Sequence, residues 1–254
     1  MRKVLGIARY TFTEIFRNKV YYVLVLFAAV LLGSSLLLGT LGGEQKNRMI
    51  LDFGLVGVEY FSLMVAVFAA TTLILEEMEA RTLHLILSRP VARYQFVVGR
   101  FLGLLLLLSV AYLVMVAGHL GVLLSQEISP DRHYFLSLLY SWEKIVVITA
   151  VGVTFSLFAT SAVSAVSFTF FFWVMGHFSS EMRFLAGKSA RPLTTVFFDV
   201  FYYVVPNFQL MNLRDLPAAG LAGTGWLWPA AGYGITYTTA CLALTIWLFR
   251  KKEF

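Results

Sequence analysis

Five side chains within the long apolar blocks of the sequence are of types that could bind a ligand: Glu59, Met115, His119, Met175 and His177. Methionine and neutral histidine can ligate soft metals such as Cu(I). Met115 and His119 are four residues apart, so a helix places them on one face. The alternative interpretation is interfacial side chains that reach lipid headgroups, together with ordinary apolar methionines. The sequence leaves both interpretations open and assigns no metal.

Signatures of catalysis are missing from the sequence. It contains neither a His-Glu-x-x-His zinc motif nor a Gly-x-Ser-x-Gly nucleophile motif. The segment Gly187-Lys188-Ser189 is similar to the end of a phosphate-binding loop, but Met182 occupies the position of the required first glycine. These patterns disfavour an intramembrane enzyme. They also indicate that the chain carries no catalytic residue or cofactor and does not hydrolyse ATP by itself.

The composition is that of a membrane protein. Of 254 residues, 59% are hydrophobic and 13% charged, whereas soluble domains carry roughly 25% charged residues. The apolar residues form continuous blocks of about the length that crosses a bilayer as a helix, and their lack of strict alternation disfavours an outer-membrane barrel. We therefore expect an all-α integral membrane protein. Its net charge of +6 fits cytoplasmic loops rich in Lys and Arg better than binding to nucleic acid.

The apolar blocks predict how these side chains are positioned. We expect one transmembrane domain over residues 1–254, with spans at about 20–38, 54–75, 97–124, 143–160, 162–178 and 229–249. Residues 1–19 have the pattern of a basic amphipathic helix that lies on the membrane surface. The apolar block from 143 to 178 is too long for one span, so a tight turn is expected near 160–162. Residues 179–228 are expected to form an extracytoplasmic loop with a short interfacial helix.

The distribution of cations predicts the orientation. With the amino terminus inside, 12 Lys and Arg residues fall on inner segments and 8 on longer outer segments, with Lys144 counted among the outer ones. This bias favours both termini in the cytoplasm, which an even number of spans requires. The same orientation places residues 76–93 in the cytoplasm.

The linker from Glu76 to Arg93 is the most informative stretch. It carries three glutamates, three arginines and one histidine between two apolar blocks, so it must face water. Its glutamates come first and its arginines later, an order that suits a helix, and Pro90 ends the pattern. An ordinary connection would hold about 2–8 residues. The pattern favours a helix that contacts a soluble partner over a solvated loop.

The linker resembles the cytoplasmic coupling segment of type-2 ABC transporter permeases. Glu76-Glu77-Met78-Glu79-Ala80-Arg81-Thr82-Leu83, Leu87-Ser88-Arg89-Pro90-Val91-Ala92-Arg93 and Val98-Gly99-Arg100 carry the resemblance. Arg81 stands where many members have glycine, and this departure points toward the branch of permeases for multicopper-enzyme or nitrous-oxide-reductase maturation. The amphipathic start, the six expected spans and the basic ending extend the resemblance over the whole chain.

The resemblance implies partners and a function. Such permeases dimerise, as homodimers or heterodimers, in the bacterial cytoplasmic (inner) membrane, and two copies of a separate ABC ATPase, which holds the ATP and Mg, dock beneath them. The chain would then be a transport permease, and an exporter is favoured. The alternative is a scaffold that anchors a maturation complex without moving substrate. The residues implied to contact the ATPase are Glu76, Glu77, Glu79, Arg81, Thr82, Leu83, His84, Leu87, Ser88, Arg89 and Arg93.

Overall fold

The computed structural model describes most of the chain. The described residues are 2–17, 26, 29–30, 33–34, 36–37, 39–40, 43–79, 92–188, 192–213, 225 and 227–251, and for residues 2, 73–79, 180 and 192 only the backbone is described. Within these residues every regular element is a helix. The predicted all-helical class is therefore confirmed for the described part of the chain.

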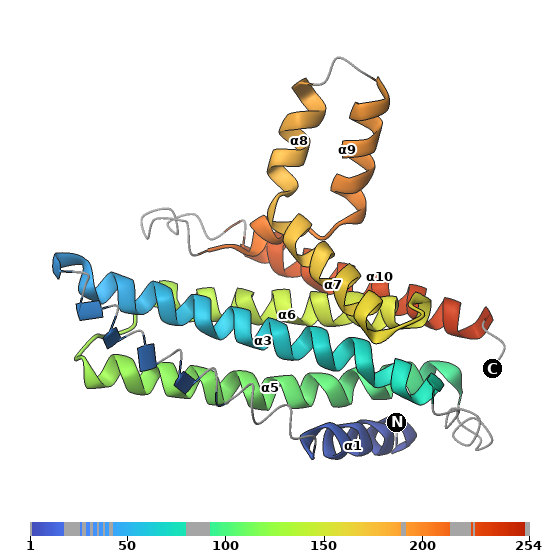
Figure 1. Cartoon of the computed structure of the whole chain (residues 1–254), viewed down its shortest axis with the longest axis horizontal. Helices are drawn as coiled ribbons and strands as arrows, with labels where there is room; N and C mark the ends of the chain where they lie inside the picture. The colour runs from blue at the N-terminus through green and yellow to red at the C-terminus, as the bar shows by residue number, and fades with distance from the viewer. Residues whose placement is uncertain are drawn as a thin grey trace.

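Long helices that run side by side form the body of the molecule (Figure 1). They are α3 (Lys46–Glu79), α5 (Arg93–Ser125), α6 (Arg132–Phe158) and α10 (Leu227–Lys251). The short helix α1 (Arg2–Phe16) lies against α5, and α7 (Ala162–His177) packs on α6 and α3. The helices α8 (Ser179–Lys188) and α9 (Pro192–Val204) pack on each other and project from this bundle. The short 3-10 helices are η1 (Gly43–Gln45) and η2 (Phe208–Met211).

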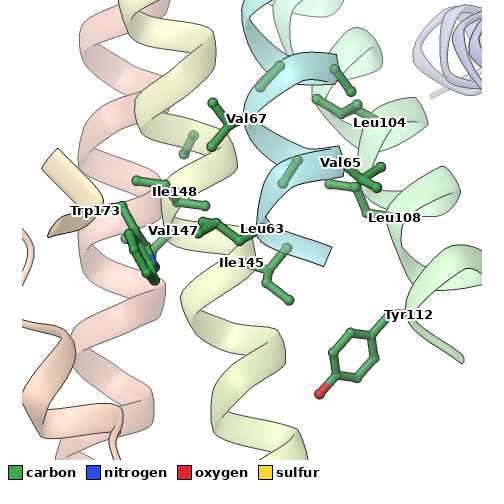
Figure 2. Packing of buried hydrophobic residues seen from close by; sticks show 14 of the residues in the cluster. Leu63, Val65, Val67, Leu104, Leu108, Tyr112, Ile145, Val147, Ile148 and Trp173 are labelled. Carbon is green, nitrogen blue, oxygen red and sulfur yellow. The ribbon is translucent and has the colours of Figure 1, made fainter. Parts of the chain in front are cut away.

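The core surrounds α3, which lies between α5 and α6. Figure 2 shows Val65 beside Leu104 and Leu108 of α5, while Leu63 lies beside Val147 of α6. These side chains are almost fully buried, and a helix that is apolar on all sides is expected at the centre of a bundle. The position of α3 explains why a polar side chain on it can meet partners from several helices.

The helices long and apolar enough to cross a membrane number four in the described part of the chain. They are Gly43–Thr72, Arg93–Ser125, Arg132–Phe158 and Leu227–Lys251. The bent pair α7 and α8, at 71° to each other, gives a fifth candidate if it is counted as one span. The expected span at 20–38 lies mostly outside the described residues. Multiple passes are supported, while the total of six spans stays a prediction.

Two of these helices start earlier than the sequence pattern suggested. α3 begins at Lys46 rather than near residue 54, through a segment expected to be a polar loop, and an Arg48–Asp52 pair four residues apart lies on its exposed first turns. α6 begins at Arg132 rather than near 143, where Asp131 accepts a hydrogen bond from the Tyr134 backbone N–H. Charged residues can extend an apolar helix beyond the hydrocarbon core, so hydropathy alone underestimates its length.

The break between α6 and α7 lies at residues 159–161, beside the turn predicted from the sequence. Ala159 adopts an extended conformation after Phe158. Ser161 then accepts a hydrogen bond from the Ser164 N–H, and the Ser164 hydroxyl accepts one from the Ser161 N–H. This reciprocal arrangement is a capping box. It pairs two of the backbone N–H groups at the start of α7 that the helix itself cannot satisfy.

Candidate functional site

The first three turns of α5 contact both α1 and the end of α10. We call the residues that make these contacts the α5 cluster: Arg93, Phe96, Gly99, Arg100 and Gly103. They follow directly after residues 80–91, the central part of the predicted coupling segment, which lie outside the described residues. The helix starts at Arg93, where the Gln95 side chain accepts a hydrogen bond from the Ala92 N–H at 3.2 Å.

Arg93 binds the carboxyl end of α10. Its Nη1 donates to the carbonyl oxygens of Phe249 at 2.9 Å and Arg250 at 2.8 Å. The last carbonyls of a helix have no partner within the helix and carry its partial negative charge, so a guanidinium is a favourable ligand for them. Phe96 stacks on Phe249 at 5.6 Å between ring centroids. Together these contacts fasten the last turn of α10 to the first turn of α5.

Arg100 binds α1 from a buried position. Its Nη1 donates to Glu14 Oε2 at 2.5 Å and to Thr11 Oγ1 at 3.2 Å. The guanidinium also lies over the rings of Tyr10 and Phe96. Its side chain is 2% exposed, whereas that of Glu14 is 40% exposed. The pair therefore joins α1 to α5, with its basic partner inside the interface and its carboxylate at the edge.

Two glycines allow α1 to approach α5 closely. A Cβ on Gly103 would lie 2.5 Å from the backbone oxygen of Ala8, and one on Gly99 would lie 2.8 Å from the side chain of Ile7. The face of α1 that enters this groove includes the buried residues Ala8, Thr11 and Ile15. Small residues four apart permit such backbone contact between helices. Here they serve packing within the chain, between α1 and α5.

The residues expected to contact an ATPase lie at or beyond the edge of the described structure. Glu76, Glu77 and Glu79 form part of the last turns of α3, and the structure describes their backbone alone. Arg93 belongs to the α5 cluster. The remaining ones lie outside the described residues: Arg81, Thr82, Leu83, His84, Leu87, Ser88 and Arg89.

A second polar group lies inside the bundle, around Glu59 of α3. We call it the Glu59 cluster: Glu59, Ser141, Lys144 and His177. Lys144 Nζ donates to Glu59 Oε1 at 2.9 Å, Ser141 Oγ donates to Oε2 at 2.8 Å, and His177 Nε2 lies 4.0 Å from Oε1. The side chains of Glu59 and Lys144 are 5% and 3% exposed. Lys144 had been counted among outer-segment cations, and the structure corrects this, since it is a buried residue of α6.

The five side chains considered as a ligand cluster are only partly brought together. His177 approaches Glu59, and Met115 Sδ accepts a hydrogen bond from Ser62, one turn from Glu59, at 3.5 Å. Met175 is half-buried in the last turn of α7. Within the described residues, His, Cys, Asp and Glu side chains form no group of three that could hold a metal ion. Since Lys144 already neutralises Glu59, the cluster is suited to joining helices rather than to binding a cation.

His119 occupies a separate position that joins three helices. Its Nε2 lies 3.3 Å from the Ile50 carbonyl oxygen of α3, and its Nδ1 lies 2.9 Å from the Tyr134 hydroxyl of α6. With both nitrogens engaged, a neutral ring donates to Ile50 and accepts from Tyr134. A Cβ on Gly54 would collide with the ring. Because Gly54 has no side chain, the His119 ring can pack directly against α3.

Sequence reasoning overlooked Arg100, Lys144 and Glu14 as partners in buried pairs. Lys144 entered the sequence analysis only as a charge that reports orientation, and Arg100 only as such a charge and as part of the motif that carries the resemblance. The one available signal for Arg100 was its position between Gly99 and Gly103, two small residues at the spacing of a helix contact. Nothing in the spacing of Glu59 and Lys144, 85 residues apart, marked them as a pair.

Comparison with known proteins assigns the family. The search of curated proteins found no match. The family model described as ABC-2 family transporter protein matches residues 7–254, which include the α5 cluster, the Glu59 cluster and the segment between α3 and α5. The chain therefore belongs to the ABC-2 family of transporter proteins, and it is a multi-pass membrane component of an ABC transporter.

Proposed function

We propose that this chain is an exporter permease that dimerises and couples ATP hydrolysis by a separate cytoplasmic ATPase to movement of its membrane helices. The family assignment supplies the class of transporter. The observation that carries the coupling proposal is the α5 cluster, because it begins where the predicted coupling segment ends. A displacement of that segment would reach α5 directly, as it would reach α3 at the other end of the segment.

The contacts of the α5 cluster make α5 a suitable lever. Arg93 fixes the end of α10 and Arg100 fixes α1, so both helices would follow a movement of the first turns of α5. Charge-assisted hydrogen bonds are stronger and more directional than apolar contacts. A push on α5 would therefore move three elements together rather than bend one of them.

The arrangement of the chain ends supports the orientation in this proposal. The contacts of Arg93 and Arg100 bring the carboxyl end of α10 and the helix α1 to the same end of α5. That end adjoins residues 80–91. If these residues face the cytoplasm, both termini do as well, in the inner membrane of a bacterium. Arg250 and Lys251, in the last turn of α10, would then follow the preference of basic residues for that side.

The proposed assembly has two permease subunits and two ATPase subunits. The second permease subunit is either another copy of this chain or a related one. ATP and Mg would be held by the ATPase. The α5 cluster with α1 would form part of the surface beneath the membrane on which the ATPase docks.

Association and coupling are tested by separate variants. Arg81→Glu with Arg89→Glu reverses the charge of the linker and is expected to abolish co-purification of the ATPase while membrane insertion remains. Arg100→Gln removes the link to α1 and is expected to keep co-purification, because the linker that would make the main contact with the ATPase is unchanged. It should lower the ATPase rate of the complex in liposomes toward that of the isolated ATPase.

Arg132→Gln is the matched control, since Arg132 is exposed at the opposite end of the bundle, at the start of α6. It should retain both association and the wild-type rate. Undiminished co-purification in the linker variant would contradict the docking proposal. A wild-type ATPase rate with Arg100→Gln would contradict the lever proposal, and a complex that hydrolyses ATP without moving any substrate would indicate a scaffold.

A further inference from the structure

A cavity of about 520 Å³ lies between α5, α6 and α10. Its walls are largely apolar and include Phe101 and Leu105 of α5, Val146 of α6 and Leu242 of α10. It is separate from both clusters described above. The volume falls within the roughly 300–1,000 Å³ that is typical of small-molecule sites.

Two polar atoms at this cavity have no partner in the described part of the chain. They are Oε1 of Glu143 and Oγ1 of Thr238, and both atoms are buried. Thr238 is only 8% exposed as a residue. A threonine hydroxyl within a helix usually donates to the carbonyl one turn earlier, so its unmet hydrogen bond is unusual. Buried polar groups without partners are rare enough to call for a ligand or another explanation.

Glu143 lies deep along α6 and in contact with α10. It is 11 residues after the start of the helix, or about 17 Å along its axis. A Cβ on Gly234 would collide with Glu143 Oε1, so this glycine makes room for the carboxyl group beside α10. Gly234 and Thr238 are one turn apart, which places the carboxyl group and the hydroxyl along the same side of the cavity.

Glu143 has no basic partner in the part of the chain that the structure describes, although the next residue along the helix is a lysine. Lys144 points to α3 and pairs with Glu59 at 2.9 Å. No salt bridge joins Glu143 to a basic side chain of the described residues. A charge within a membrane helix is costly when unpaired, so the cavity offers a site where a cation from outside the described residues would be stabilised.

The mouth of the cavity is formed by exposed apolar side chains. Leu102, Leu139 and Ile235 line the cavity and are 42%, 59% and 64% exposed. Apolar residues on the outside of a membrane bundle face acyl chains. A ligand would therefore enter from the bilayer and needs an apolar body.

We propose that this cavity binds an amphiphilic primary amine with a single alkyl chain. After a rotation of the Glu143 and Thr238 side chains toward the cavity, the ammonium group would pair with the Glu143 carboxylate and donate to the Thr238 hydroxyl, while the chain would fill the apolar part. An ammonium has three donors and can serve both acceptors. A neutral alkyl chain would leave both polar atoms unpaired, and an anion would be repelled by the carboxylate. The proposal goes beyond the coupling function and does not depend on it.

The test measures binding of radiolabelled dodecylamine to the full-length chain in phosphatidylcholine nanodiscs by equilibrium dialysis, with empty nanodiscs subtracted. Saturable binding of about one molecule per chain is expected. Glu143→Gln keeps the shape and removes the charge, and it should weaken binding by at least about tenfold. Thr238→Val removes only the hydroxyl and should weaken binding by about threefold.

Two comparisons keep the result specific. Glu127→Gln removes a carboxylate from an exposed position and should bind dodecylamine like the wild type. Dodecanol has the same chain without the charge, and its binding should be weaker and equal in the wild type and in Glu143→Gln, which also shows that the variant is folded. Three results would overturn the proposal. They are dodecylamine binding that Glu143→Gln leaves unchanged, wild-type binding of dodecanol as strong as that of dodecylamine, and the absence of saturable dodecylamine binding. The last result is expected if a second copy of the chain covers the mouth.

Discussion

The α5 cluster and the Glu59 cluster both contain a buried basic residue paired with a carboxylate, but they differ in what they join. Lys144 and Glu59 are both almost fully buried and connect α6 with α3, at the centre of the bundle. Arg100 is buried while Glu14 is partly exposed, and this pair connects α5 with α1 at the periphery. The central pair joins two helices of the bundle core, whereas parting of the peripheral pair would expose the face that α1 and α5 share, around Ala8.

This difference predicts that single changes in the two regions have unlike effects. Changes in the Glu59 cluster or around His119 should lower the free energy of unfolding of the whole bundle. Changes in the α5 cluster should loosen α1 and leave the bundle intact. The following experiments test this separation, from the largest expected effect to the smallest.

Lys144→Met should have the largest effect because it leaves the Glu59 carboxylate buried without its cation. Breaking a buried pair in this way costs about 3–5 kcal/mol, which should appear as a lower free energy of unfolding in a denaturant titration in mixed micelles. The double variant Lys144→Met with Glu59→Met replaces the pair by apolar side chains and should recover most of the loss. Equal losses in the single and double variants would contradict this cause, because the loss would then not come from a buried carboxylate without its cation.

Gly54→Ala should have the next largest effect. The added Cβ would collide with the His119 ring and disturb its hydrogen bonds to Ile50 and Tyr134. Overpacking of this kind costs about 1–3 kcal/mol, measured by the same titration. Gly121→Ala is the matched control on α5, since a Cβ there would meet no atom within 4 Å. A Gly54→Ala protein as stable as this control would mean that His119 can move aside freely.

Gly103→Ala should have the smallest effect on global unfolding and a clear local one. The added Cβ would press on the Ala8 carbonyl and separate α1 from α5. We expect faster trypsin cleavage after Arg9 and Arg17, by about tenfold, with a change in unfolding free energy below about 1 kcal/mol. Gly232→Ala, where a Cβ meets no atom within 4 Å, is the control. A large drop in global stability would remove the distinction between the two regions.

The sequence predicts the helices better than it predicts their pairing. The apolar blocks indicate α3, α5, α6 and α10 because apolar helices of this length have few alternatives in a membrane. Ser161 and Ser164 stand at the spacing of a capping box, and the break between α6 and α7 lies there. These features depend on local composition and are visible in one sequence.

The contacts between helices depend on distances along the chain that local patterns do not contain. In the sequence, Lys144 cannot be distinguished from any other cation of the outer segments. Its role appears only in the folded chain, where α3 places Glu59 beside it. Arg100 likewise gains its role only when α1 supplies Glu14.

Hydropathy also placed the start of α6 near residue 143, because Glu143 and Lys144 separate the apolar residues 134–142 from the longer apolar block that follows. For the candidate site, local patterns therefore predict the segment and name one member of the α5 cluster, Arg93. Its contact with an ATPase stays a prediction, and its bonds to the end of α10 were not foreseen.

The close fit of α1 into the groove at Gly103 has a consequence for biosynthesis. α1 ends at Phe16, so it leaves the ribosome nearly 90 residues before the groove that receives it. At about 5–20 residues per second, the delay is roughly 4–18 seconds. During that interval the apolar face around Ala8 and Ile15 needs another cover, and an amphipathic helix can find it at the lipid surface. Assembly of the newborn chain would then finish with α1 moving from lipid to protein.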